Sequence, residues 1–78
     1  MLERGTWIRS RKGEVARDEN DRKVQTGPNA LGCITSIDVD GQGKPYYGVL
    51  FRNNVWVFLD DEHLAHADLY EVMGHLED

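Results

Sequence analysis

Residues 45–59 hold two runs of β-branched and aromatic residues that flank Asn53 and Asn54. Asparagine tolerates the left-handed backbone that a tight two-residue turn requires, so this stretch predicts a β-hairpin. Both faces of the hairpin are apolar, whereas a hairpin on a solvated surface has one apolar and one polar face. We therefore expect a barrel interior to cover one face. A long loop, the C-terminal segment or another chain is needed to cover the second.

A two-residue turn at Asn53-Asn54 also predicts the register of the hairpin, with Phe51 opposite Trp56. Side chains alternate along a strand, so the two faces follow from the register. One face is expected to carry Tyr47, Val49, Phe51, Trp56 and Phe58, and the other Leu50, Val55, Val57 and Leu59. A longer turn would shift the register by one residue, and both faces would remain apolar.

The aromatic and apolar residues of this hairpin are the first candidates for a binding surface. Tyr and Trp are enriched at the energetic hot spots of protein interfaces. The same residues also suit a hydrophobic core, and the sequence leaves both roles open. The candidate binding or interface residues are Tyr46, Tyr47, Phe51, Val55, Trp56, Val57 and Phe58.

The length of 78 residues predicts a single domain over residues 1–78. A chain this short buries only about 60–65% of its surface, and oligomerisation is a common remedy. The net charge is −5, and all nine Lys and Arg lie in residues 1–52. Residues 53–78 hold seven acids and no Lys or Arg. Nucleic acid is therefore not the expected partner, because phosphate contacts need clustered Lys and Arg.

Cysteine usage and hydropathy indicate the compartment. Cys33 is the single cysteine, which excludes a disulfide framework and favours a reducing compartment. As a lone residue on an apolar strand, it is expected to be a small core hydrophobe. No apolar segment of the kind found in a signal peptide follows Met1-Leu2-Glu3-Arg4, and no run is long enough to span a membrane. We expect a cytoplasmic protein without membrane contact.

Residues 5–11 predict a first strand in which Ile8 points inward. The following residues, 12–30, form a long polar loop of mixed charge. A loop of this length in a compact domain is functional, partly mobile or a hairpin of its own. The turn residues Gly27-Pro28-Asn29 close it.

Two further strands are predicted on either side of the central hairpin. Residues 31–39 form one strand, and alternation places four of its side chains on one face. These four are Leu31, Cys33, Ile37 and Val39. Residues 68–73 form a last short strand, and residues 74–78 a C-terminal tail.

Residues 60–67 predict a short helical turn with Asp60 as N-cap. His63 and His66 lie three residues apart there, on one face, with several acids nearby. His and carboxylate groups can bind a transition metal. A third ligand at fixed spacing is not evident, so we expect a solvated acidic turn, no metal and no cofactor.

The order of these elements resembles that of SH3-like barrels, in which a strand and a long loop precede three strands, a helical turn and a closing strand. The residues that carry the resemblance are Gly5-x-x-Ile8-x-Ser10, Gly32-x-Ile34-x-x-Ile37, Tyr47-Gly48-Val49-Leu50-Phe51, Trp56-Val57-Phe58-Leu59 and Asp68-Leu69-Tyr70-Glu71-Val72. The resemblance implies an all-β fold, a five-stranded SH3-like barrel with a long loop after the first strand. Such barrels bind peptides, nucleic acids or larger protein complexes, and the fold does not choose among these functions.

A narrower resemblance links the chain to the type II dihydrofolate reductases, which are SH3-like chains that form tetramers around a pore. Their pore strand carries a Val-Gln-Ile-Tyr motif, and the matching residues here are Val55-Trp56-Val57-Phe58. Both hydrogen-bonding side chains are replaced, so this reductase activity is not expected. What the resemblance implies is a self-associating barrel.

Trp7, Arg9 and Arg11 share one face of the first predicted strand. An aromatic ring beside two arginines could contact a nucleic acid or another anion. The alternative is a tryptophan that covers the outer wall of the barrel beside solvated arginines. The acidic net charge favours this alternative.

These observations predict a small, non-catalytic binding module, and no residue stands out as catalytic. The module is expected to self-associate, or to dock on a larger protein as a subunit of a complex, through the apolar central hairpin. A small-molecule-binding protein or an enzyme with its site at an oligomer interface is one alternative. A barrel that binds nucleic acid is the other.

Overall fold

The computed structural model describes residues 2–75, in which strands predominate. The strands are β1 (Thr6–Ser10), β2 (Val15–Arg17), β3 (Lys23–Gln25), β4 (Ala30–Val39), β5 (Pro45–Phe51), β6 (Trp56–Asp60) and β7 (Tyr70–His75). A 3-10 turn, η1 (Arg52–Asn54), joins β5 to β6, and the helix α1 (Asp61–Leu64) follows β6. The prediction of a mainly β protein is confirmed. No helix within residues 2–75 has the length and hydropathy needed to cross a membrane.

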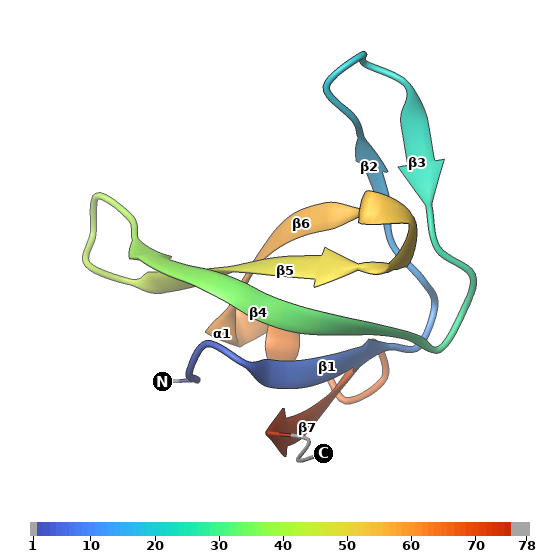
Figure 1. The fold of residues 1–78 in the computed structure, drawn as a ribbon. Helices are drawn as coiled ribbons and strands as arrows, with labels where there is room; N and C mark the ends of the chain where they lie inside the picture. The colour runs from blue at the N-terminus through green and yellow to red at the C-terminus, as the bar shows by residue number, and fades with distance from the viewer. Residues whose placement is uncertain (1, 76–78) are drawn as a thin grey trace.

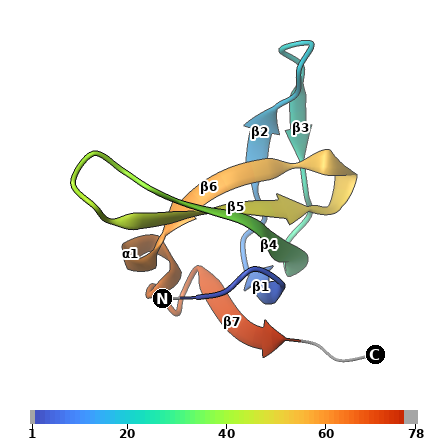
Figure 2. The ribbon, with the colours of Figure 1, turned by 60° about the vertical axis from the view of Figure 1, so that its left-hand side comes forward.

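Five strands form one antiparallel sheet in the order β6-β5-β4-β1-β7. The sheet bends, so that β7 lies below the layer formed by β4, β5 and β6 (Figures 1 and 2). Hydrogen bonding within residues 2–75 does not join the edge strands β6 and β7 to each other. Helix α1 contacts both of these edge strands. The four-residue helix therefore bridges the two ends of the bent sheet.

One hydrophobic core takes side chains from five strands and from α1. Alternation along β1 and β5 turns Ile8, Tyr47 and Val49 inward, and each is fully buried. The inward position predicted for Ile8 is confirmed. The buried hydrophobic residues of the core are Ile8, Ala30, Ile34, Tyr47, Val49, Phe51, Val55, Leu59, Leu64 and Tyr70.

The turn of the central hairpin has three residues, so the predicted register is wrong by one position. The backbone N–H of Phe51 donates to the carbonyl of Val55 at 2.8 Å, and Arg52–Asn54 lie between them. Leu50 lies opposite Trp56. Asn53 and Asn54 adopt left-handed φ angles of 63° and 57°, as expected for asparagine in a tight turn. Because Arg52 is part of the turn, each residue of β5 pairs with a residue of β6 one position away from its predicted partner.

The corrected register separates the two faces of the hairpin, both of which are apolar as predicted. The inner face carries Tyr47, Val49, Phe51, Val55, Val57 and Leu59. The outer face carries Tyr46, Gly48, Leu50, Trp56 and Phe58. Trp56 and Phe58 thus lie on the outer face. The predicted register had placed them on one face with Tyr47, Val49 and Phe51, which lie on the inner face.

A β-bulge in β4 changes which of its side chains share a face, so the predicted face of this strand is wrong. The register with β5 shifts between Ile34 and Ser36, so Thr35 is the extra residue. Ile34 lies on the inner face and is 1% exposed, whereas Cys33 lies on the outer face. Ile37 returns to the core after the bulge. The prediction that Leu31, Cys33, Ile37 and Val39 share one face is therefore wrong, because alternation does not continue through a bulge.

Residues 12–30 contain a hairpin, formed by β2 and β3, that stands away from the five-stranded sheet (Figures 1 and 2). Side-chain contacts attach its base. The Asn53 amide of η1 donates to the carbonyl of Gln25 at 3.2 Å, which joins the hairpin to the central turn. The backbone N–H of Glu14 donates to the Thr26 hydroxyl at 2.8 Å, which closes the base of the hairpin itself. The other end of the chain also differs from expectation, because β7 runs to His75. The predicted tail therefore begins inside the strand, and residues 76–78 lie outside the described residues.

Candidate functional site

The outer face of the sheet is the side turned away from the core. One row of its residues crosses four neighbouring strands, since Trp56 pairs with Leu50, Leu50 with Cys33, and Cys33 with Trp7. Directly paired side chains on one face of a sheet lie about 5 Å apart. The row therefore forms a continuous apolar band across β6, β5, β4 and β1.

An aromatic patch, defined as Tyr46, Leu50, Trp56 and Phe58, occupies the β5–β6 part of this face. The rings of Tyr46 and Phe58 meet edge to face with centroids 5.7 Å apart, and those of Trp56 and Phe58 lie 6.0 Å apart. Leu50 is 40% exposed, Trp56 51% and Phe58 64%. Three large apolar side chains thus remain accessible beside one another.

The absence of a side chain at Gly48 shapes this patch. Gly48 lies opposite Phe58 in the ladder, between the neighbouring outer positions Tyr46 and Leu50. A Cβ atom built at Gly48 would lie 2.8 Å from Nε1 of Trp56 and would also collide with the Ser36 hydroxyl. The indole therefore lies against the backbone of β5, which orients it on the outer face.

Two neighbouring hollows border β1 and β4, and one of them shares Leu50 with the aromatic patch. This first hollow, termed the outer hollow, measures about 410 Å³ and is lined by Trp7, Leu31, Cys33, Thr35, Leu50, Phe51 and Arg52. The second, termed the arginine hollow, measures about 510 Å³ and lies between the β3–β4 loop and the η1 turn. The two hollows share Leu31 and Arg52.

Trp7, Arg9 and Arg11 do not form a free basic surface. Trp7 and Arg9 are half-buried on the outer face of β1. Arg9 lies 3.4 Å from Glu71, and Arg11 lies 3.7 Å from the same carboxylate. Arg11 also donates to the carbonyl of Ala67 at 2.8 Å. Glu71 therefore offsets part of the positive charge that a phosphate backbone would need.

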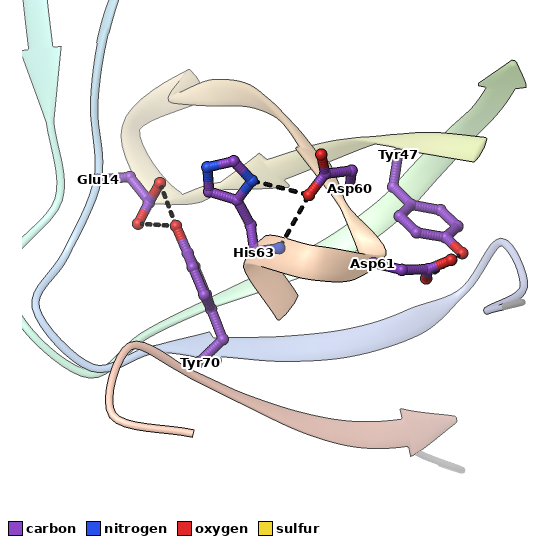
Figure 3. Close-up of polar contacts among 6 residues, drawn as sticks. All are labelled: Glu14, Tyr47, Asp60, Asp61, His63 and Tyr70. Carbon is purple, nitrogen blue, oxygen red and sulfur yellow. Dashed lines mark hydrogen bonds and ion pairs between the residues drawn. The ribbon is translucent and has the colours of Figure 1, made fainter. Parts of the chain in front are cut away.

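The other candidate residues of the central hairpin lie on the inner face. Phe51 and Val55 are buried, and Val57 is half-buried against the core. Tyr47 is also buried, but its hydroxyl donates to Asp61 at 2.7 Å (Figure 3). Burial, reinforced by this hydrogen bond, raises the pKa of Tyr47. Of the seven candidates, Tyr46, Trp56 and Phe58 present their side chains on the outer face.

Asp60 and His63 are in contact at the start of α1, and they form an ion pair when the imidazole is protonated. Asp60 accepts from the backbone N–H of His63 at 2.8 Å and lies 2.7 Å from its Nδ1 (Figure 3). The predicted N-cap is confirmed. The two hydrogen bonds from His63 lower the pKa of Asp60, and the carboxylate raises the pKa of His63. His66 is exposed, and its backbone N–H donates to the carbonyl of His63.

A polar cluster that sequence reasoning missed joins Ser10, Glu14 and Tyr70. The Tyr70 hydroxyl lies 2.9 and 3.0 Å from the two carboxylate oxygens of Glu14 (Figure 3). The Ser10 hydroxyl donates to the same carboxylate at 2.6 Å. Burial, followed by the bond to Glu14, raises the pKa of Tyr70. This cluster fastens the base of the β2–β3 hairpin to β1 and β7. No motif marks it, because Tyr70 lies 56 positions from Glu14 along the chain.

Comparisons with family models, with curated proteins and with solved structures found no match for this chain. Within residues 2–75, no group of three or more His, Cys, Asp and Glu side chains is arranged to hold a metal ion. What the outer face offers chemically is exposed aromatic surface and arginine. Exposed aromatic rings and guanidinium groups are side chains of the kind enriched at the hot spots of protein interfaces.

Proposed function

We propose that this chain is a small, non-catalytic binding module that self-associates through the aromatic patch. The supporting observation is the exposure of Leu50, Trp56 and Phe58 side by side on an ordered sheet. Buried aromatic residues contribute most of the binding energy in many protein interfaces. Removing apolar surface from water is worth about 25 cal/mol per Å², so covering this patch favours association.

The proposed fold is an SH3-like barrel, in which α1 completes the closure that hydrogen bonding leaves open. The strand order β6-β5-β4-β1-β7 and a hairpin within the first long loop support this assignment. Contacts of α1 with both edge strands supply the bridge. In this fold the aromatic patch lies on the outer wall, where a second copy can reach it.

A nucleic-acid-binding function has less support than self-association. The chain carries a net charge of −5, and Arg9 and Arg11 share Glu71. Phosphate binding depends on accessible cationic side chains that release counterions.

The solution mass, measured by size-exclusion chromatography with light scattering over a range of concentrations, tests the proposal. The wild-type chain is expected to form a dimer or a larger closed assembly. Trp56→Ser and Phe58→Ser are expected to shift it to monomer. Val15→Ser is the matched control, because Val15 is 59% exposed but lies on the β2–β3 hairpin. A monomeric wild type at every concentration would reject self-association.

A further inference from the structure

The outer hollow owes its shape to a large–small–large row. Trp7, Cys33 and Leu50 are consecutive partners across β1, β4 and β5. The small Cys33 side chain, between an indole and a branched aliphatic group, leaves space above the sheet. The resulting volume of about 410 Å³ falls within the range of small-molecule sites, about 300–1,000 Å³.

The lining of this hollow is mostly apolar, and it includes one cationic residue, Arg52. Arg52 lines both the outer hollow and the arginine hollow, so one arginine is common to the two spaces. Arg9 lines the arginine hollow from β1. Apolar walls beside a guanidinium are complementary to a ligand that has an apolar body and a charged end.

The sign of the lining charges indicates which charge the ligand carries. Arg9 and Arg52 are the charged side chains that line the two hollows, although the chain as a whole carries a net charge of −5. Arg9 is paired with Glu71 at 3.4 Å. Among residues 2–75, Arg52 forms no ion pair within 4.0 Å. Its guanidinium is therefore available to an external anion.

We propose that the outer hollow binds an organic anion with an apolar body, and that Arg52 binds the anionic end. The apolar body lies between Trp7 and Leu50 over Cys33. A guanidinium presents its donors as a planar fork that matches a carboxylate or sulfonate. The site lies next to the aromatic patch, shares Leu50 with it, and extends the function beyond self-association.

Two fluorescent probes separate the apolar part of this proposal from the anionic part. The anionic probe is 8-anilinonaphthalene-1-sulfonate, and the neutral probe is N-phenyl-1-naphthylamine, which has a similar ring system without the sulfonate. Wild-type protein is expected to bind both. Arg52→Gln is expected to weaken binding of the anionic probe roughly tenfold, because one charge-assisted hydrogen bond is lost. Binding of the neutral probe is expected to stay unchanged.

Matched variants assign the binding to this site. Arg17→Gln makes the same change of charge on the distant β2–β3 hairpin and is expected to leave both probes unchanged. Cys33→Leu fills the hollow and is expected to abolish both. If Cys33→Leu does not fold, protection of the wild-type thiol replaces it, because bound probe is expected to slow alkylation of Cys33 by iodoacetamide.

Any of three results would overturn the proposal. The first is that Arg52→Gln and Arg17→Gln weaken binding of the anionic probe equally, and the second is that Arg52→Gln weakens binding of both probes equally. The third is that bound probe leaves the alkylation rate of Cys33 unchanged. The titrations are repeated with Trp56→Ser, whose altered side chain does not line the hollow. Binding by a monomeric Trp56→Ser would support the site independently of self-association. If the wild type is monomeric but still binds the anionic probe, the proposed self-association is rejected and the proposed binding site in the outer hollow is retained.

Discussion

The hydroxyl of Tyr70 donates to the carboxylate of Glu14, at 3.0 Å from Oε1 and 2.9 Å from Oε2. The two residues lie 56 positions apart in the chain. Glu14 begins the β2–β3 hairpin region and Tyr70 begins the last strand. This contact therefore connects the projecting hairpin to the strand that completes the sheet.

Tyr70→Phe is expected to destabilise the protein by about 1–2 kcal/mol, because one hydrogen bond to a charged group is lost. The change removes only the hydroxyl, so the buried ring remains. Hydrogen exchange is expected to accelerate at the backbone N–H groups of Glu14 and Thr26, which bond across the base of the hairpin. Urea unfolding and amide exchange measured by NMR check the two effects.

Tyr46→Phe is the control for this prediction. The ring of Tyr46 packs on Phe58, and its hydroxyl forms no hydrogen bond to another described residue. The free energy of unfolding of Tyr46→Phe should stay within about 0.5 kcal/mol of the wild-type value. Equal destabilisation by both substitutions would show that the Glu14 contact contributes little.

Gly32→Ala is expected to destabilise the fold by about 1–3 kcal/mol through overpacking. Gly32 pairs with Phe51, and a Cβ atom built at Gly32 would lie 2.6 Å from the Phe51 ring. The buried ring cannot move away without disturbing its neighbours. Gly41→Ala is the control, since a Cβ atom there meets no atom within 4 Å. Urea unfolding of both variants tests the prediction, and similar stability in the two would contradict it.

The Asp60–His63 pair predicts a specific pH dependence of stability. The pKa of His63 is raised by Asp60, so its contribution is complete below about pH 6.5 and is lost as pH rises through the folded-state pKa. The pKa of Asp60 is lowered, so its contribution is lost as pH falls below about 4. NMR titration of the imidazole should show the raised pKa, and Asp60→Asn should return it towards 6.5, about the ordinary value. An unchanged titration in Asp60→Asn would contradict the pairing.

Alkaline pH is expected to destabilise the protein through Tyr47 and Tyr70. Burial raises the pKa of both phenols, and the carboxylates of Asp61 and Glu14 raise it further. The neutral phenols therefore stabilise the fold below about pH 10, and this contribution is lost as pH rises through their folded-state pKa values. Tyrosinate absorbance, compared among wild type, Tyr47→Phe and Tyr70→Phe, measures each ionisation. Ionisation of both residues near pH 10 in the folded protein would contradict this prediction.

The five strands of the main sheet could be located from the sequence, because turn residues and apolar runs mark them. Their faces were harder to assign. The face of the central hairpin depends on whether Arg52 belongs to the turn, and the amide of Asn53 helps to hold that turn against Gln25. The bulge at Thr35 likewise appears only when β4 pairs with β5. Both features arise from tertiary contacts that no local pattern contains.

The candidate site was predicted in part. The aromatic residues of the hairpin were identified by composition, but the register was needed to separate exposed Trp56 and Phe58 from buried Phe51 and Val55. Arg52 was not predicted as a site residue, because its position in the lining of both hollows depends on β1, β4 and the η1 turn. Sequence patterns report which residue types are present, whereas exposure follows from pairing across the sheet.

Helix α1 has a consequence for how copies of this chain can meet. A bare edge strand is a template for further strands and permits open-ended, fibre-like growth. Residues Asp61–Leu64 contact both β6 and β7, so one short helix connects the two edge strands. Loss of this helix is therefore expected to separate β6 from β7 and to leave both edges open to pairing with strands of another chain.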